Sequence, residues 1–247
     1  KKGEVAIFWL SQNSYVIKTF GGTLFAIDPY LSRDESYSYV HPEPPVKPED
    51  FNVHYIFCTH DHLDHTDPVS LPIMARTYPD ILFFGPREAC AHLVELGVRE
   101  DRVKALEAET PYSVGDIKVT AFYSVPPEEA ETTHFGYLFE VDEVKIYNMG
   151  DTYQSVVENP KRILEPVIRK RPDIAMLPII GDTPERKPED AFLFAKLIKP
   201  KVVIPSHYDC FKDRTIDPRK FTALFKDMPD IKPITIPYKG VYIFRKN

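Results

Sequence analysis

The sequence has few cysteines, and none of them forms a pair of the kind that binds metal or builds a disulfide framework. Its 3 cysteines, Cys58, Cys90 and Cys210, are odd in number, widely spaced and contain no CxxC pair. A disulfide-stabilised secreted domain and a cysteine-ligated zinc site are therefore not expected. We expect a reducing, cytoplasmic setting, and the polar start Lys1-Lys2-Gly3-Glu4 does not resemble a signal peptide.

Glycine is also scarce, and with it the loops that cradle phosphates. The chain has 10 glycines in 247 residues, about half the usual share. It contains no GxGxxG fingerprint, Walker loop, GxSxG elbow or HExxH helix. These absences remove the common dinucleotide, nucleotide, serine-hydrolase and zincin classes.

The chain also lacks a net positive charge and long apolar runs. The formal net charge is −6, and no basic stretch is interleaved with aromatic residues, so we expect no nucleic-acid partner. No apolar run approaches the roughly 18 residues that span a bilayer. At 43% hydrophobic, the chain can still bury a substantial core.

Short apolar runs predict the architecture. No linker or repeat divides the chain, so we expect one domain over residues 1–247. The predicted strands are 5–10, 15–19, 24–27, 54–58, 81–84, 117–122, 136–141, 144–147, 174–177, 202–205 and 241–245. The predicted helices are 70–77, 88–96, 188–198 and 218–226. Strands followed by α/β alternation, twice over, favour an αββα sandwich in the α/β class, because a (β/α)₈ barrel needs a more regular rhythm.

The crowded part of the sequence is Thr59-His60-Asp61-His62-Leu63-Asp64-His65, directly after the strand 54–58. In extended backbone the rings of His60 and His62 point the same way, and Asp64 and His65 can turn back in a loop. A solvated loop would not favour three histidines and two aspartates, since protonated neighbours repel. Imidazole and carboxylate together suit zinc, manganese or iron. Four ligands exceed what one catalytic zinc usually takes from protein, which favours two metals about 3.5–4 Å apart.

Two later segments offer further ligands. Asp151 follows the strand 144–147 at a Gly150 turn, and a carboxylate there can bridge two cations. His207 follows the strand 202–205 and adds an imidazole. Either residue alone would be an ordinary loop residue; with the first cluster, both become candidate ligands.

These motifs, in this order, resemble the metallo-β-lactamase superfamily, whose HxHxDH signature matches THDHLDH. The resemblance extends to a branch that holds L-ascorbate-6-phosphate lactonase and the N-acyl-phosphatidylethanolamine phospholipase D. The other matching segments are Asp28-Pro29-Tyr30-Leu31, Gly150-Asp151-Thr152, Leu177-Pro178 through Pro188-Glu189-Asp190-Ala191, and Val202 to Tyr208.

The resemblance implies a role for each ligand. His60 and His62 would bind the first metal, Asp64, His65 and His207 the second, and Asp151 would bridge them. The resemblance implies two divalent ions per chain, with zinc or manganese as the preferred metals and iron as a third candidate. A hydroxide formed at the metals would attack an ester, lactone or phosphodiester, with Asp64 as the catalytic residue that orients it.

One position departs from the family pattern. The family usually supplies a third histidine to the first metal, and Tyr123-Ser124 stand where a common form places it. The nearest histidine is His134, just before the strand 136–141, in an arrangement similar to other branches. We therefore assign His134 as a ligand, with a surface-loop histidine as the alternative.

Several functions stay open. The first is a lactonase or esterase acting on a small anionic substrate; the second is a phosphodiesterase. An amidohydrolase barrel and a metal-binding module without turnover are further alternatives. No substrate-binding residue is assigned, although the loop cations near the motifs could meet an anion: Arg33, Arg186, Lys187 and Arg214. A homo-oligomer is also left open.

Overall fold

The computed structural model describes residues 3–181 and 185–246, and their strands form two seven-stranded sheets. The first sheet has the order β14-β1-β2-β3-β4-β5-β6. Its strands are β1 (Glu4–Trp9), β2 (Tyr15–Lys18), β3 (Leu24–Ile27), β4 (Tyr55–Phe57), β5 (Leu82–Gly85), β6 (Val103–Ala105) and β14 (Val241–Arg245). Hairpins join β1 to β3, so these strands are antiparallel, whereas β3 to β6 run parallel.

The second sheet has the order β13-β12-β11-β10-β9-β8-β7. Its strands are β7 (Pro111–Val114), β8 (Ile117–Tyr123), β9 (Phe135–Val141), β10 (Val144–Asn148), β11 (Ile174–Pro178), β12 (Val202–Ser206) and β13 (Lys232–Pro233). It is antiparallel from β7 to β10 and parallel from β10 to β13. Each sheet is therefore mixed.

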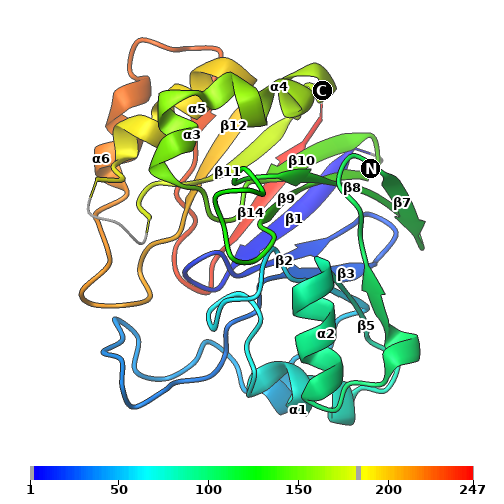
Figure 1. Ribbon diagram of the computed structural model, residues 1–247. Helices are drawn as coiled ribbons and strands as arrows, with labels where there is room; N and C mark the ends of the chain where they lie inside the picture. Colours follow the sequence, from blue (N-terminus) through cyan, green and yellow to red (C-terminus); the bar gives the residue numbers. More distant parts are fainter. Residues whose placement is uncertain (1–2, 182–184, 247) are drawn as a thin grey trace.

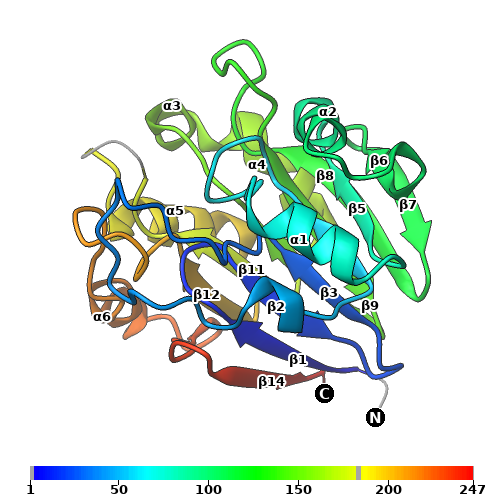
Figure 2. The same cartoon turned by 90° about the horizontal axis from the view of Figure 1, so that it is seen from below.

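Helices cover the outer face of each sheet (Figures 1 and 2). Helices α1 (Ser70–Thr77) and α2 (Arg87–Glu95) lie over the first sheet. Over the second lie α3 (Gln154–Glu158), α4 (Pro160–Lys170), α5 (Pro188–Ile198) and α6 (Arg219–Thr222). Single 3₁₀ turns are η1 (Pro48–Asp50), η2 (Glu100–Arg102) and η3 (Ala223–Phe225). Among the described helices, none is both long and apolar enough to cross a membrane.

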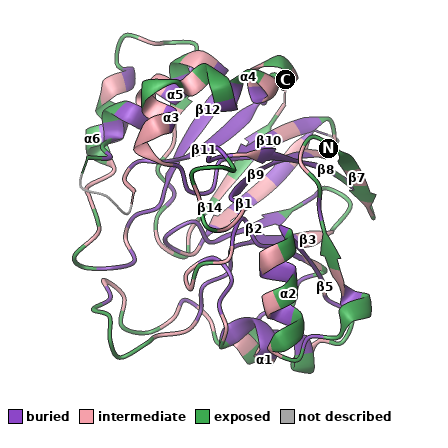
Figure 3. Ribbon diagram, viewed as in Figure 1, coloured by how far each residue is buried: buried purple, intermediate pink, exposed green. Residues whose placement is uncertain are grey.

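The two sheets share one core, which is buried along the strand interiors (Figure 3). The ring of Phe139 in β9 lies 4.7 Å from that of Phe25 in β3 and 4.9 Å from that of Phe57 in β4. Strands β11 and β12 are buried at every residue, as expected of parallel strands covered on both faces. The arrangement confirms the predicted αββα sandwich, and the barrel alternative is wrong.

Three of the described helices differ from the prediction, and the short α3 is one of two that were not predicted. The segment expected as one helix over 218–226 is the short α6 followed by the 3₁₀ turn η3. Helix α4 was not predicted, because Pro166 stands inside it and charged residues cover its outer side. Its packing face of Ile163, Leu164 and Val167 keeps helical spacing and is buried.

Candidate metal centre

The predicted ligands lie at one edge of the sandwich, where strands of both sheets end. The loop after β4 supplies four of them: His60, His62, Asp64 and His65. A tight turn brings the last two back, since the backbone N–H groups of His65 and Thr66 both donate to the His62 carbonyl, at 3.0 and 2.7 Å.

The second sheet supplies the other three. His134 immediately precedes β9, Asp151 follows β10, and His207 follows β12 with a left-handed φ of 63°. The Phe135 N–H donates to the Thr59 carbonyl at 2.9 Å, which holds the start of β9 against the loop of the first sheet. Ligands far apart in the chain therefore meet because the strand ends of the two sheets face each other.

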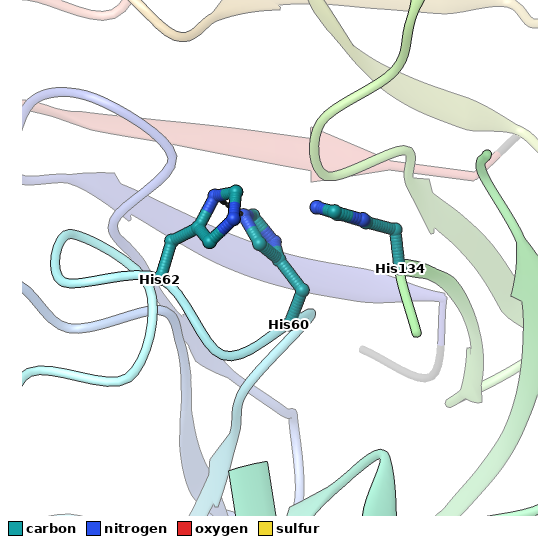
Figure 4. A group of neighbouring side chains, drawn as sticks. All are labelled: His60, His62 and His134. Atoms are coloured by element: carbon teal, nitrogen blue, oxygen red, sulfur yellow. Dashed lines mark hydrogen bonds between the residues drawn. The ribbon is translucent and has the colours of Figure 1, made fainter. Parts of the chain in front are cut away.

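Three groups of side chains have ligand atoms within 4.8 Å of one another: His60, His62 and His134; Asp64, His65 and His207; and, between these, His60, His65 and Asp151. Figure 4 shows the rings of the first group turned toward a common point. The His60 ring centroid lies 4.0 Å from that of His134. The structure thus brings His134 beside His60 and His62, and its assignment as the third ligand stays a prediction.

Asp151 lies between the two histidine groups. Its Oδ2 is 3.1 Å from His207 Nε2 and 3.9 Å from His60 Nε2, and its Oδ1 is 3.4 Å from His65 Nε2. One carboxylate therefore reaches imidazoles of both groups, which is the geometry that a bridging ligand needs.

Unpartnered buried atoms test whether these residues fit a metal. Within the described residues, the atoms without a hydrogen-bond partner include Asp151 Oδ1, His65 Nε2 and both ring nitrogens of His134 and of His207. A buried polar atom without a partner costs about 1–3 kcal/mol, so this concentration at one point is unfavourable unless something binds there. Nitrogen and oxygen donors fit divalent zinc, manganese or iron.

The shifts in pKa distinguish neutral imidazoles from an anionic carboxylate among the candidate ligands. Burial lowers the pKa of His134 to about 4 and holds that of His60 well below its usual value, so both rings are neutral, the form that binds metal. Burial acts to raise the pKa of the Asp151 carboxyl, yet His207 and His65 bring it well below the usual range. Burial is the main cause that raises the pKa of the Cys210 thiol to about 12, which keeps it protonated and unsuited to a metal.

Asp28 is a site residue whose role the sequence did not reveal. It is fully buried, and its carboxylate accepts from His65 Nδ1 at 2.6 Å, Thr59 N at 2.7 Å, Thr59 Oγ1 at 2.6 Å and Asn13 Nδ2 at 2.7 Å. The bond to Nδ1 fixes the tautomer of His65 and leaves Nε2 for a metal. The segment Asp28-Pro29 is one of the segments that match the family. Its carboxylate directly follows β3, much as Asp151 follows β10, and this position could have indicated a site residue.

Gln12 was also missed, because Gln12-Asn13 has the composition of an ordinary turn. Its side-chain Nε2 donates to Asp64 Oδ2 at 2.8 Å, and its backbone carbonyl accepts from the His207 N–H at 3.0 Å. It is 2% exposed and has a left-handed φ of 52°. Gln12 therefore contacts ligands from both halves of the chain.

A pocket of about 390 Å³ opens beside Asp151. Its lining residues are Glu129, Asp151, Thr152, Tyr153, Gln154, Ser155, Glu185 and Arg186. Of the four loop cations considered from sequence, only Arg186 lines it. Arg33 and Arg214 lie over the rings of Tyr39 and Phe211.

The two-sheet sandwich with a histidine and carboxylate centre at one edge defines the metallo-β-lactamase fold. A Beta-lactamase superfamily domain model matches residues 6–207, and the chain belongs to this superfamily and, within it, to the UPF0173 metal-dependent hydrolase family.

Two relatives carry that family name. One, from Anoxybacillus flavithermus, is 34% identical over 218 residues, covering 85% of this chain and 88% of the relative. The other, from Symbiobacterium thermophilum, is 30% identical over 234 residues, covering 93% and 96%.

Solved structures share the fold over nearly the whole chain. A metallo hydrolase from Ignicoccus hospitalis aligns with a TM-score of 0.71 at 22% identity, covering 99% of this chain and 100% of that one. An isothiocyanate hydrolase from Delia radicum gut bacteria aligns with a TM-score of 0.72 at 19% identity, covering 98% and 100%. At these identities the likeness concerns the fold alone.

Proposed function

We propose that the protein hydrolyses a lactone or ester of a small substrate at a centre that holds two divalent metal ions. The position of Asp151 carries the proposal, because its two oxygens face imidazoles of both histidine groups. His60, His62 and His134 would hold one ion, and Asp64, His65 and His207 the other. The family name supports metal-dependent hydrolysis, and the choice of lactone or ester rests on the resemblance to the lactonase branch.

Zinc or manganese, with iron as a third candidate, would supply Lewis acidity and a water activated at neutral pH. The chain's own residues position the reacting groups. Burial acts to raise the pKa of the Asp64 carboxyl, but the neighbouring His65 lowers it below its usual value, so Asp64 is an anion at neutral pH. Gln12 holds Oδ2 of Asp64, and this fixes the carboxylate that we assign to orient the attacking water.

The charge balance of the loaded centre favours an anionic group at the ions. Two divalent cations and the carboxylates of Asp64 and Asp151 leave a net positive charge, since the five histidine ligands are neutral when bound. A carbonyl oxygen that gains negative charge during attack would be stabilised there. This supports the expected small anionic substrate if its negative charge, or the carbonyl oxygen that gains it, lies at the ions.

Metal content and turnover test the proposal together. We expect about two metal ions per chain, and turnover of lactones or esters after stripped protein is reloaded with zinc, manganese or iron in turn. Asp64→Ala should abolish turnover. Asp61→Asn is the matched control, because Asp61 lies in the same loop but pairs with His92 at 2.8 Å.

Other outcomes contradict the proposal in distinct ways. Turnover confined to phosphodiesters would assign the second candidate activity. Tight metal binding without turnover on lactones, esters and phosphodiesters would indicate a metal-binding module. The single domain over residues 1–247, the cytoplasmic setting and a homo-oligomer stay predictions.

A further inference from the structure

The pocket beside Asp151 is contiguous with the candidate centre. Asp151 lines it directly, and its buried Oδ1 has no hydrogen-bond partner among the described residues. The Tyr153 ring, also in the lining, lies 5.5 Å from the ring of His134. A substrate whose reacting group sits at the centre would therefore extend a neighbouring part into this pocket.

Carboxylates set the charge of this pocket. Glu129 and Glu185 both line it and are exposed. Glu129 Oε1 lies 3.5 Å from Arg162, but Arg162 is shared with Glu128 and is not part of the lining. Within the described residues, Glu185 makes no ion pair at all.

Arg186 does not offset these acids, because its guanidinium is already engaged. It is 4% exposed, its Nε donates to Asp190 Oδ2 at 3.2 Å, and Nη1 donates to the Thr152 carbonyl at 2.5 Å. A third contact reaches the Pro178 carbonyl at 3.5 Å. Its charge is paired with Asp190 and its donors point into protein, so it offers little to an anion in the pocket.

Two further lining residues, Gln154 and Ser155, each have a side-chain atom without a partner in the described part of the chain. Gln154 Oε1 and Ser155 Oγ are buried and form no hydrogen bond with the described residues. Both can accept a hydrogen bond from a donor group.

We infer that this pocket binds the part of the substrate next to the scissile bond, and that it selects a group that is cationic or a neutral hydrogen-bond donor over an anionic group. The inference rests on the proposed function and specifies its substrate: an anionic or carbonyl group belongs at the centre, while the neighbouring group must carry no negative charge. A phosphate or carboxylate on this part of the substrate would be repelled by Glu129 and Glu185. Among the described lining residues, the one cation, Arg186, is already paired with Asp190.

Three matched esters test the charge preference. Acetylcholine carries a trimethylammonium group, 3,3-dimethylbutyl acetate is its uncharged isostere, and 4-acetoxybutanoate carries a carboxylate. We expect kcat/KM to fall in that order, with about tenfold between the first and the last, because charges near a protein surface still interact appreciably. A second set with the same three groups on the acyl side covers the other orientation.

Variants locate the preference. Glu185→Gln and Glu129→Gln should each reduce the cationic-to-anionic ratio, and the double variant should remove it, chiefly through KM. Glu128→Gln is the matched control, since Glu128 also pairs with Arg162 but does not line the pocket. An equal effect in the control, or an anionic preference in the wild type, would overturn the inference.

A binding readout keeps this test separate from that of the reaction. Calorimetry with choline and with butanoate measures the preference without turnover. If no ester or lactone is hydrolysed, the proposed function fails, and the calorimetry still decides the pocket. If esters are hydrolysed and the ratio of choline to butanoate affinity is the same in the wild type and in the Glu129→Gln, Glu185→Gln double variant, only the pocket inference fails, because butanoate bound at the ions would not depend on these two residues.

Discussion

Gln12 Nε2 lies 2.8 Å from Asp64 Oδ2, so a buried amide from the first hairpin holds one oxygen of the predicted catalytic carboxylate. The backbone carbonyl of Gln12 also accepts from the N–H of His207, a candidate ligand from the second sheet. This contact leads to the first prediction.

Gln12→Leu should weaken metal binding at the position held by Asp64, His65 and His207 by about 10–100-fold, the usual cost of losing a residue that orients a ligand. Binding at the His60, His62 and His134 position should change little. Competition with a chelator, resolved into two steps, measures both. Trp9→Phe is the control, because it removes the Nε1 donor to the Gln12 carbonyl, 3.1 Å away, but keeps the Gln12 side chain. Equal losses in the two variants would show that Gln12 only supports the loop.

His134→Ala should weaken the first metal position by at least about tenfold, as expected when one of three protein ligands is lost. His54→Ala, which removes an exposed histidine just before β4, should leave both positions unchanged. Zinc titrations followed by calorimetry measure the affinity of each metal position in both variants. An unchanged affinity in His134→Ala would return this residue to the surface-loop alternative.

Asp28→Asn should destabilise the metal-free protein by about 3 kcal/mol, because a buried carboxylate that accepts from several donors would be replaced by a group that must itself donate. It should also weaken the second metal position, since His65 loses its Nδ1 acceptor. Urea unfolding at pH 7 measures the first effect. Asp116→Asn serves as the control, because Asp116 is an exposed residue with one bond to Thr19. A small, equal change in both variants would contradict the role given to Asp28.

We expect the carboxyl of Asp173, which is not one of the candidate metal ligands, to make an acid-sensitive contribution to the free energy of unfolding. Burial acts to raise the pKa of its carboxyl, but bonds from Lys246, the Lys145 N–H and Lys201 bring it below the usual value. A carboxyl with a lowered folded-state pKa stabilises the fold above its unfolded pKa of about 3.9, and this contribution is lost as the pH falls through the folded pKa.

The free energy of unfolding of metal-free wild type should therefore exceed that of Asp173→Asn at pH 7, and the difference should shrink below about pH 4. Urea titrations across this range measure it. Asp227→Asn, at a highly exposed aspartate, should show no such trend. A difference that is constant with pH would contradict the assignment.

The sequence predicted the sandwich and the loop of His60 to His65 because both depend on local patterns. Alternating apolar runs form strands, and four ligand residues within one loop need no knowledge of the rest of the chain. Asp151 and His207 were also found, since each follows a strand. The structure brings all seven candidate ligands together, and metal binding by them stays a prediction.

The contacts that sequence could not predict are those made across the chain. Gln12 and Asp64 are 52 residues apart, and Asp28 and His65 are 37 apart. Their meeting depends on how the hairpins of the first sheet place their ends, which no local pattern specifies. The surface-loop alternative for His134 has the same origin, because the bond between Phe135 N and the Thr59 carbonyl, which holds the start of β9, joins distant parts of the chain.

Each histidine group of the candidate centre draws ligands from both sheets, and this makes metal affinity a property of the whole sandwich. Any ions bound there would hold the two sheets together, so the free energy of binding and that of sheet packing are linked. A cavity made between Phe25 and Phe139, neither of which is a candidate ligand, would then appear as weaker metal retention. Conversely, the metal-loaded protein would tolerate core substitutions that unfold the stripped chain.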